Sequence, residues 1–235
     1  MELKNLVEQQ RETLLKTLQA CIQIPSVQEE DGSAYPYGAN IQRCLEFMLN
    51  TGKELGFKTE NLDNQAGWCE LGEGEEMVAV LGHLDVVPAG EGWHGDPFSG
   101  EIRDGKVFGR GSMDDKGPTV AALYALKALK ESGLPLRRRV RLLMGTNEET
   151  GSADMKYYLA HGGETPVMGF TPDGEYPLIN GEKGIVNVTF RRELRQSGPV
   201  RLKKLSGGSA PNVVPASAAA ELECPEDLAG KIVEA

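Results

Sequence analysis

A histidine and an aspartate stand two positions apart at the end of an apolar run. The stretch Met77–Pro88, MVAVLGHLDVVP, predicts a buried strand that ends in His83 and Asp85. Side chains two positions apart on an extended chain point to the same side, so these two share one space. The pair indicates either a hydrogen-bonded core histidine or half of a metal site, because metal-bound imidazoles commonly donate their second N–H to a carboxylate.

Acidic residues recur in three further segments, each of which follows an expected strand or precedes an expected helix. The candidate carboxylates in the segments GRGSMDDKGP, GTNEETGS and FTPDGEYP are Asp114, Asp115, Glu148, Glu149 and Asp173. Each segment alone also suits helix capping or a Pro-Asp-Gly turn. Sites in open α/β sheets assemble at the carboxyl ends of strands, so we expect these groups to converge.

The convergence itself predicts a cation site. One imidazole and up to six carboxylates in one crevice carry too much negative charge to coexist without partners. One or two divalent cations would neutralise them. The residues alone leave open whether Asp114 or Asp115 is the ligand.

Other catalytic chemistries have weaker signals. The glycines of FGRGSMDDKG do not form the G-x-x-x-x-G-K-[ST] phosphate loop, and two aspartates would repel phosphate. Ser112 lacks the G-x-S-x-G context of an activated serine. The four cysteines form no C-x-x-C pair, so we expect reduced and mostly buried thiols; they are Cys21, Cys44, Cys69 and Cys224.

Charge and hydropathy exclude several classes of partner. The net charge is −10, whereas nucleic-acid binding favours a basic face. No apolar run reaches the roughly 20 residues of a membrane span. The charged start MELKNLVEQQ lacks the apolar core of a secretory signal. We therefore expect a cytoplasmic protein that binds neither nucleic acid nor membrane.

The periodicity of apolar residues predicts the elements that position these groups. Helices are expected over 3–22, 40–55, 121–130 and 152–163, and strands over 57–61, 67–71, 78–82, 140–146 and 167–173. A hairpin is expected around Asp104-Gly105. Alternating strands and helices are typical of an α/β fold, with a mostly parallel twisted sheet flanked by helices.

The pattern changes after Gly184. The segments IVNVTFRREL at 185–194 and AAAELEC at 218–224 predict strands, and PEDLAGKIVEA predicts the opening of an amphipathic helix. We expect residues 1–184 to form a metal-binding catalytic domain and residues 185–235 to begin an α+β lid domain. On this interpretation the sequence is the front part of a longer protein.

The motifs resemble a known family. GHLDVVPAGEGW, GRGSMDDKGP, GTNEETGS and TPDGEYPLINGEKG are similar to the motifs of the co-catalytic zinc peptidases. That family includes aminoacylase, acetylornithine deacetylase and succinyl-diaminopimelate desuccinylase. NEET and DGEYPLINGE resemble most the PepV-like Xaa-His, carnosinase-type dipeptidases. The resemblance runs from IPSV at 24–27 to APNVVP at 210–215.

The resemblance implies a set of metal ligands. It implies that His83 binds one metal and that Asp85 orients its imidazole. Asp114 would bridge two metals, and the peptide bond that follows it would be cis. Glu149 would bind the second metal, and Asp173 would bind the same metal as His83.

The resemblance also implies a mechanism. Two zinc ions, with manganese or cobalt as substitutes, would lower the pKa of a shared water. Glu148 would act as the general base, and Asn212 would contact substrate from the lid domain. The implied reaction is hydrolysis of dipeptides with a free amino end. Small peptides are the expected partners, and a homodimer is compatible with the resemblance.

One family feature is missing. The family has a second histidine ligand near the end of its full-length members, and neither His94 nor His161 fits that position. Both are expected at the surface. Two alternatives therefore stay open: the same site could hydrolyse N-acyl amino acids, and the chain as given could be an inactive piece of a dipeptidase.

Overall fold

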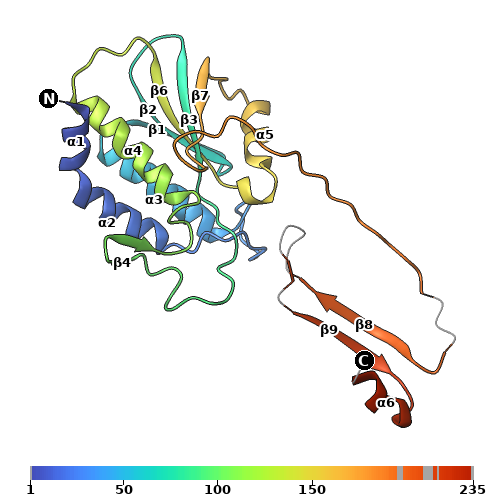
Figure 1. The fold of residues 1–235 in the computed structure, drawn as a ribbon. Helices are drawn as coiled ribbons and strands as arrows, with labels where there is room; N and C mark the ends of the chain where they lie inside the picture. Colours follow the sequence, from blue (N-terminus) through green and yellow to red (C-terminus); the bar gives the residue numbers. More distant parts are fainter. Residues whose placement is uncertain (1, 195–197, 209–213, 216, 234–235) are drawn as a thin grey trace. The chain divides into compact units, whose positions relative to one another are not determined.

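The chain forms two compact units, Met1–Ile179 and Asn180–Ala235. Figure 1 shows the elements of each in a computed structural model. The structure describes residues 2–194, 198–208, 214–215 and 217–233. The assignment of residues 1–184 to a catalytic domain and 185–235 to a lid stays a prediction.

A five-stranded sheet lies at the centre of the first unit, in the order β1-β2-β6-β3-β7. The strands are β1 Lys58–Leu62, β2 Ala66–Leu71, β3 Met77–His83, β6 Arg139–Gly145 and β7 Met168–Phe170. β1 pairs antiparallel with β2 and β2 antiparallel with β6, whereas β3 is parallel to both β6 and β7. Four of these five strands therefore run in one direction, and the predicted α/β class is confirmed.

Helices cover both faces of this sheet (Figure 1). They are α1 Leu3–Gln9, α2 Arg11–Ile22, α3 Ala39–Glu54, α4 Lys116–Glu131 and α5 Ala153–Ala160. α2, α3 and α4 share one core with the sheet, while α5 packs through Tyr158 against Ala66 and Leu143 on the opposite face. The alternation of Leu142, Leu143 and Met144 between the two cores follows from the period of two along a strand.

The first expected helix is interrupted. Apolar spacing predicts a single helix over 3–22, but α1 ends at Gln9 and α2 begins at Arg11. Gln10 is buried between them, and its side-chain Nε2 donates to Glu131 Oε2 at 2.8 Å. This bond to α4 gives the interruption a tertiary partner that helical spacing does not reveal.

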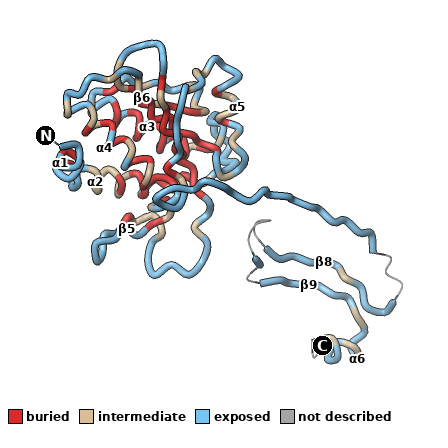
Figure 2. The backbone as a smooth tube through the Cα atoms, turned by 45° about the horizontal axis from the view of Figure 1, so that its top comes forward, coloured by how far each residue is buried: buried red, intermediate tan, exposed pale blue. Residues whose placement is uncertain are grey.

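The main core lies between the sheet and helices α2, α3 and α4. Figure 2 shows buried residues concentrated there. Leu45, Leu84 and Leu123 are fully buried, and each such side chain contributes roughly 1.5–3 kcal/mol of hydrophobic stabilisation. This packing fixes the strand ends that carry the acidic segments.

The expected hairpin is present. β4 Glu101–Arg103 pairs antiparallel with β5 Lys106–Phe108. Asp104 and Gly105 join them with φ of 52° and 72°, as a two-residue turn with two left-handed positions requires.

The second unit departs from the expectation. Its elements are β8 Arg201–Gly207, β9 Ala218–Glu223 and α6 Glu226–Val233, and β8 pairs antiparallel with β9. The strand predicted over 218–224 and the closing helix are confirmed. The strand predicted over 185–194 is wrong: that described segment pairs with no strand, and Ile185 and Phe190 are exposed. Alternation alone does not make a strand where no neighbour accepts its backbone hydrogen bonds.

None of the described helices combines the length and the apolar character that crossing a bilayer requires.

Candidate metal centre

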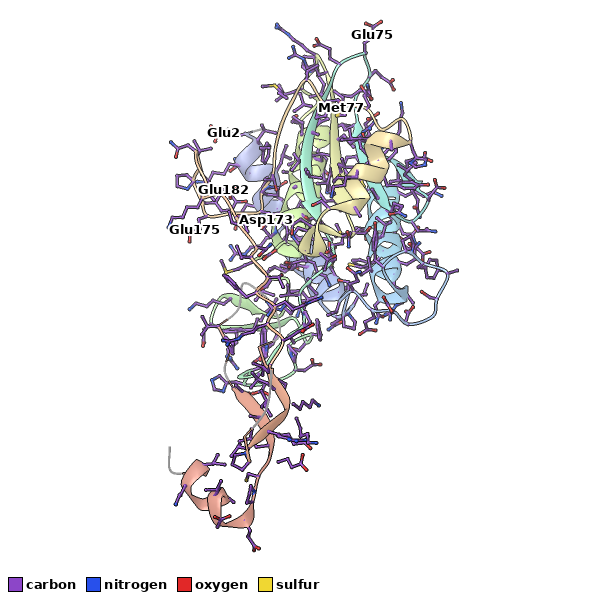
Figure 3. The ribbon with its side chains drawn as sticks, turned by 90° about the vertical axis from the view of Figure 1, so that its right-hand side faces the viewer. Glu2, Glu75, Met77, Asp173, Glu175 and Glu182 are labelled. Atoms are coloured by element: carbon purple, nitrogen blue, oxygen red, sulfur yellow. The ribbon has the colours of Figure 1, made fainter. Side chains whose placement is uncertain are left out.

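The end of β3 delivers His83 to the carboxyl edge of the sheet. Figure 3 shows Asp173 beyond the end of the sheet opposite to Met77, the first residue of β3. The His83 side chain is 3% exposed, and its Nδ1 lies 2.9 Å from the Asp85 carbonyl oxygen. A carbonyl can only accept, so Nδ1 carries a hydrogen and donates it. Nε2 is thereby turned towards the carboxylates.

Three carboxylates surround His83 Nε2. Asp114 Oδ1 lies at 3.1 Å, Asp173 Oδ2 at 3.5 Å and Glu148 Oε2 at 4.0 Å. These residues come from three separate segments that are distant in sequence. Their convergence at one nitrogen is what the positions of the acidic residues, after expected strands or before an expected helix, led us to expect.

Asp114 and Asp115 have different environments. The peptide bond between them is cis, as the family resemblance implies. The Asp114 side chain is 58% exposed and faces His83. Asp115 is fully buried, and its Oδ2 accepts hydrogen bonds from the His83 N–H and the Thr119 hydroxyl, both at 3.0 Å. The structure therefore brings Asp114 to the cluster and gives Asp115 a supporting position.

Gly82 makes this support possible. A Cβ at this position would overlap with Thr119 Oγ1 and would lie 2.8 Å from Asp115 Oδ2. Only a residue without a side chain lets β3 approach α4 so closely. The sequence analysis did not single out Gly82, although a glycine directly before the histidine is a signal for such an approach.

Asp85 holds the two glutamates in place. Its Oδ1 accepts from the Glu148 N–H and its Oδ2 from the Glu149 N–H, each at 3.1 Å. The Asp85 carboxylate is 3.4 Å from His83 Nδ1, further away than the Asp85 carbonyl. Asp85 thus contacts His83 mainly through its backbone and the glutamate segment through its side chain.

Asp154 and Gln28, which the sequence analysis did not single out, support the segment that carries the two glutamates. Buried Asp154, in α5, accepts from the N–H groups of Thr146 and Asn147 through Oδ2, at 2.6 Å and 3.0 Å. Asn147 donates through Nδ2 to Gln28 Oε1 at 3.0 Å. Asp154 resembles an ordinary helix N-terminal acid in the sequence, so only the structure reveals this role.

The cluster has strongly perturbed protonation. Burial raises the pKa of Glu149 to about 7, and the charge of Asp114 adds to the effect. Burial also raises the pKa of Glu148. Burial alone would lower the pKa of His83, but hydrogen bonds to Asp114 and Asp85 outweigh it and raise that pKa to about 11. The group thus favours a positive charge at its centre.

The described residues contain two overlapping sets of ligand atoms that could hold a metal ion. They are His83, Asp114 and Glu149, and His83, Glu148 and Asp173, and within each set the atoms lie within 4.8 Å of one another. Imidazole nitrogen and carboxylate oxygen are donors that zinc and manganese accept. All residues predicted to bind metal are among them.

The remaining predicted residues lie elsewhere. Asn212 falls outside the described residues. His94 and His161 are exposed, as expected, and the His161 ring stacks on Tyr157 at a centroid distance of 3.7 Å. Neither histidine belongs to a ligand set in the described chain.

The sequence matches a family of peptidases. Residues 79–227 match the sequence profile described as peptidase family M20/M25/M40. The chain is 42% identical over 226 residues to the putative dipeptidase YtjP of Bacillus subtilis, which covers 94% of this chain and 49% of that protein. It is 39% identical over 236 residues to the Beta-Ala-Xaa dipeptidase of Lactobacillus delbrueckii subsp. lactis, covering 99% and 50%. The chain spans about half the length of these curated relatives.

Solved structures show the same fold. Human carnosine dipeptidase 1 matches with a TM-score of 0.61 at 23% identity, over 74% of this chain and 42% of that one. A metallo-carboxypeptidase of Sulfolobus solfataricus matches with a TM-score of 0.58 at 24% identity, over 69% and 37%. At these identities the likeness concerns the fold alone.

Proposed function

The chain belongs to peptidase family M20/M25/M40, and from that premise we propose that it hydrolyses dipeptides with a free amino end at a divalent metal centre. The observation that carries the proposal is the convergence of His83 Nε2 with Asp114, Glu148 and Asp173 within 4.0 Å. The relatives named as dipeptidases support the substrate class. Because the chain spans half of their length, the activity of the whole protein is part of the proposal.

The donor set fits divalent cations. His83, Asp114, Glu149 and Asp173 would hold them, with zinc expected and manganese or cobalt as substitutes. The fit rests on a buried imidazole whose Nε2 faces only carboxylate oxygens in the described residues. When bound, such ions supply a Lewis acid for the scissile carbonyl and lower the pKa of water towards neutrality.

Glu148 suits the role of general base. Its side chain is half exposed, so water and substrate can reach it. Burial raises its pKa. A general base works best when its pKa lies near the pH at which the enzyme operates, so this shift favours proton transfer near neutral pH. Asp85 fixes its backbone N–H at 3.1 Å. Glu148 would accept a proton from the attacking water and return it to the leaving amine.

The test combines metal content with a substrate panel. Protein expressed from its natural gene is purified and its metals are measured by elemental analysis. Free dipeptides are then compared with N-acetyl and N-succinyl amino acids. We expect bound divalent metal and hydrolysis of the dipeptides. Exclusive hydrolysis of the N-acyl compounds would instead identify a deacylase, and absence of metal would overturn the proposal.

A further inference from the structure

An apolar pocket adjoins the metal cluster on the side of Glu149. It has a volume of about 290 Å³, and its apolar lining residues are Val27, Val86, Val87 and Pro88. Glu149 belongs both to this wall and to the candidate ligand set. The Val87 N–H donates to Glu149 Oε1 at 3.3 Å. A substrate held at the cluster therefore has this pocket as its neighbour.

The floor of the pocket is fixed by backbone pairing. Val27 and Val86 form a parallel β-bridge. On one side of this bridge the Ser26 hydroxyl donates to the Leu84 carbonyl at 2.6 Å, and the Val86 N–H donates to the Ser26 carbonyl at 3.0 Å. The segment at 25–28 is thus joined to the chain that follows β3. A preformed apolar wall of this kind is typical of small-molecule sites.

Two of the acceptor groups at the pocket are already engaged. Gln28 Oε1 accepts from both Asn147 and Thr150, and the Asp85 carboxylate accepts from two backbone N–H groups. Glu30 is exposed and forms no ion pair or side-chain hydrogen bond within the described residues. The described lining contains no lysine, arginine or histidine.

We infer that this pocket receives an uncharged aliphatic side chain of the substrate and that Glu30 disfavours acidic ones. This inference rests on the proposed peptide hydrolysis and deepens it by naming a class of substrate. Burying an aliphatic side chain against the valines is favourable. A substrate carboxylate in this pocket would meet Glu30 at the exposed rim, where the described lining offers no basic side chain, and like charges repel.

The first test fills the pocket. Val87→Phe is compared with Val7→Phe, because both valines are 38% exposed and Val7 lies on α1, away from the pocket. The substrates are Gly-Gly, Leu-Gly and Gly-Leu. We expect Val87→Phe to lower kcat/KM for either Leu-Gly or Gly-Leu, and to lower it at least about tenfold more than for Gly-Gly. Equal effects of the two variants on all three peptides would overturn the inference. Val27→Leu is a second filling variant, expected to act in the same direction.

The second test changes the charge at the rim. Glu30→Lys should raise the ratio of kcat/KM for Asp-Gly to kcat/KM for Leu-Gly, or the same ratio for Gly-Asp and Gly-Leu. Glu30→Gln should give a ratio between those of the unaltered protein and Glu30→Lys. An unchanged ratio in both variants would contradict the role of Glu30. Circular dichroism of each variant verifies that the fold is retained.

A binding measurement separates failure of the inference from failure of the proposed function. The probe is a leucine dipeptide whose peptide bond is replaced by CH₂–NH, added to zinc-loaded protein with labelled valine methyl groups. We expect the Val27 and Val87 methyl signals to shift, and to shift much less with the aspartate analogue. Shifts without any dipeptide hydrolysis would sustain the pocket and reject the peptidase. Dipeptide hydrolysis without methyl shifts would sustain the proposed peptidase and reject the pocket.

Discussion

At the scale of the residue, the two adjacent glutamates differ in what their surroundings offer. Both backbone N–H groups bind the Asp85 carboxylate. Glu149 contacts the Val87 N–H and joins the ligand set with Asp114, whereas Glu148 approaches His83 on the side of Asp173. The proposed function assigns proton transfer to Glu148 and metal binding to Glu149, as the family resemblance implies.

This assignment predicts that removing the Glu148 carboxylate lowers turnover alone, whereas removing the Glu149 carboxylate also lowers metal content. Glu148→Gln should leave metal content unchanged and lower kcat by roughly 10²–10⁴-fold, because a positioned general base contributes about that much. Glu149→Gln, the matched control, should lower metal content as well. Elemental analysis and steady-state kinetics measure both. Unchanged turnover in Glu148→Gln would remove Glu148 as the base.

Substitutions of the two aspartates of the cis peptide should also have different effects. Asp114→Ala should weaken zinc binding by more than the roughly 10–100-fold that removal of a ligand's supporting partner costs. Asp115→Ala should mainly destabilise the fold, by about 1–3 kcal/mol, because it leaves the buried His83 N–H without its acceptor. Zinc titration and urea unfolding distinguish these effects. Identical behaviour of the two variants would contradict the division of roles.

At the scale of the element, the approach of β3 to α4 depends on Gly82. We expect Gly82→Ala to destabilise the protein by roughly 1–3 kcal/mol, because the added methyl group has no space beside Thr119 and Asp115. Gly95→Ala is the control, since a Cβ there meets no atom within 4 Å. Urea unfolding measures both. Equal midpoints would show that the strand and helix can move apart freely.

The N-terminus of α3 predicts a pH dependence. Hydrogen bonds from Ser33 and from the Ala39 N–H lower the pKa of Asp31 to about 2, against roughly 3.9 for an unfolded chain. The folded state therefore binds this proton less readily, so the carboxylate stabilises the fold above about pH 4. That contribution is lost as the pH falls towards 2.

The matching experiment compares Asp31→Asn with the unaltered chain between pH 7 and pH 2. The variant should be less stable at pH 7, and the difference should shrink below pH 4. Glu29→Gln, an exposed acidic neighbour, is the control and should show no such trend. A difference that grows on acidification would reverse the sign of the linkage.

Much of this arrangement could be predicted from the sequence because each acidic segment follows an expected strand or precedes an expected helix. His83 and the acidic groups were candidates for that reason, and the family resemblance singled out Asp114 and Glu149 within their pairs. The support was not recognisable: Asp154 and Gly82 act through contacts with segments distant in sequence. β8 was missed because RLKKLSG alternates weakly and carries two lysines. The interruption at Gln10 coincides with a hydrogen bond to α4 that apolar spacing does not reveal.

At the scale of the whole molecule, the described buried residues all precede residue 180. Both hydrophobic clusters and both ligand sets lie within the unit Met1–Ile179. The interactions that stabilise the candidate metal centre should therefore lie within that unit. Segment 180–194 contributes only exposed side chains, so its removal should expose little apolar surface and cost little free energy.

This distribution predicts that a chain ending at Ile179 folds like the 235-residue chain. Its urea midpoint should be unchanged, and it should bind zinc with an affinity within about threefold, because all described ligands are retained. A chain ending at Gly163 is the contrasting control: it lacks β7 and Asp173, and should lose both stability and zinc affinity. Urea unfolding and zinc titration compare the three chains. Loss of folding on truncation at Ile179 would mean that the second unit supplies contacts on which the sheet depends.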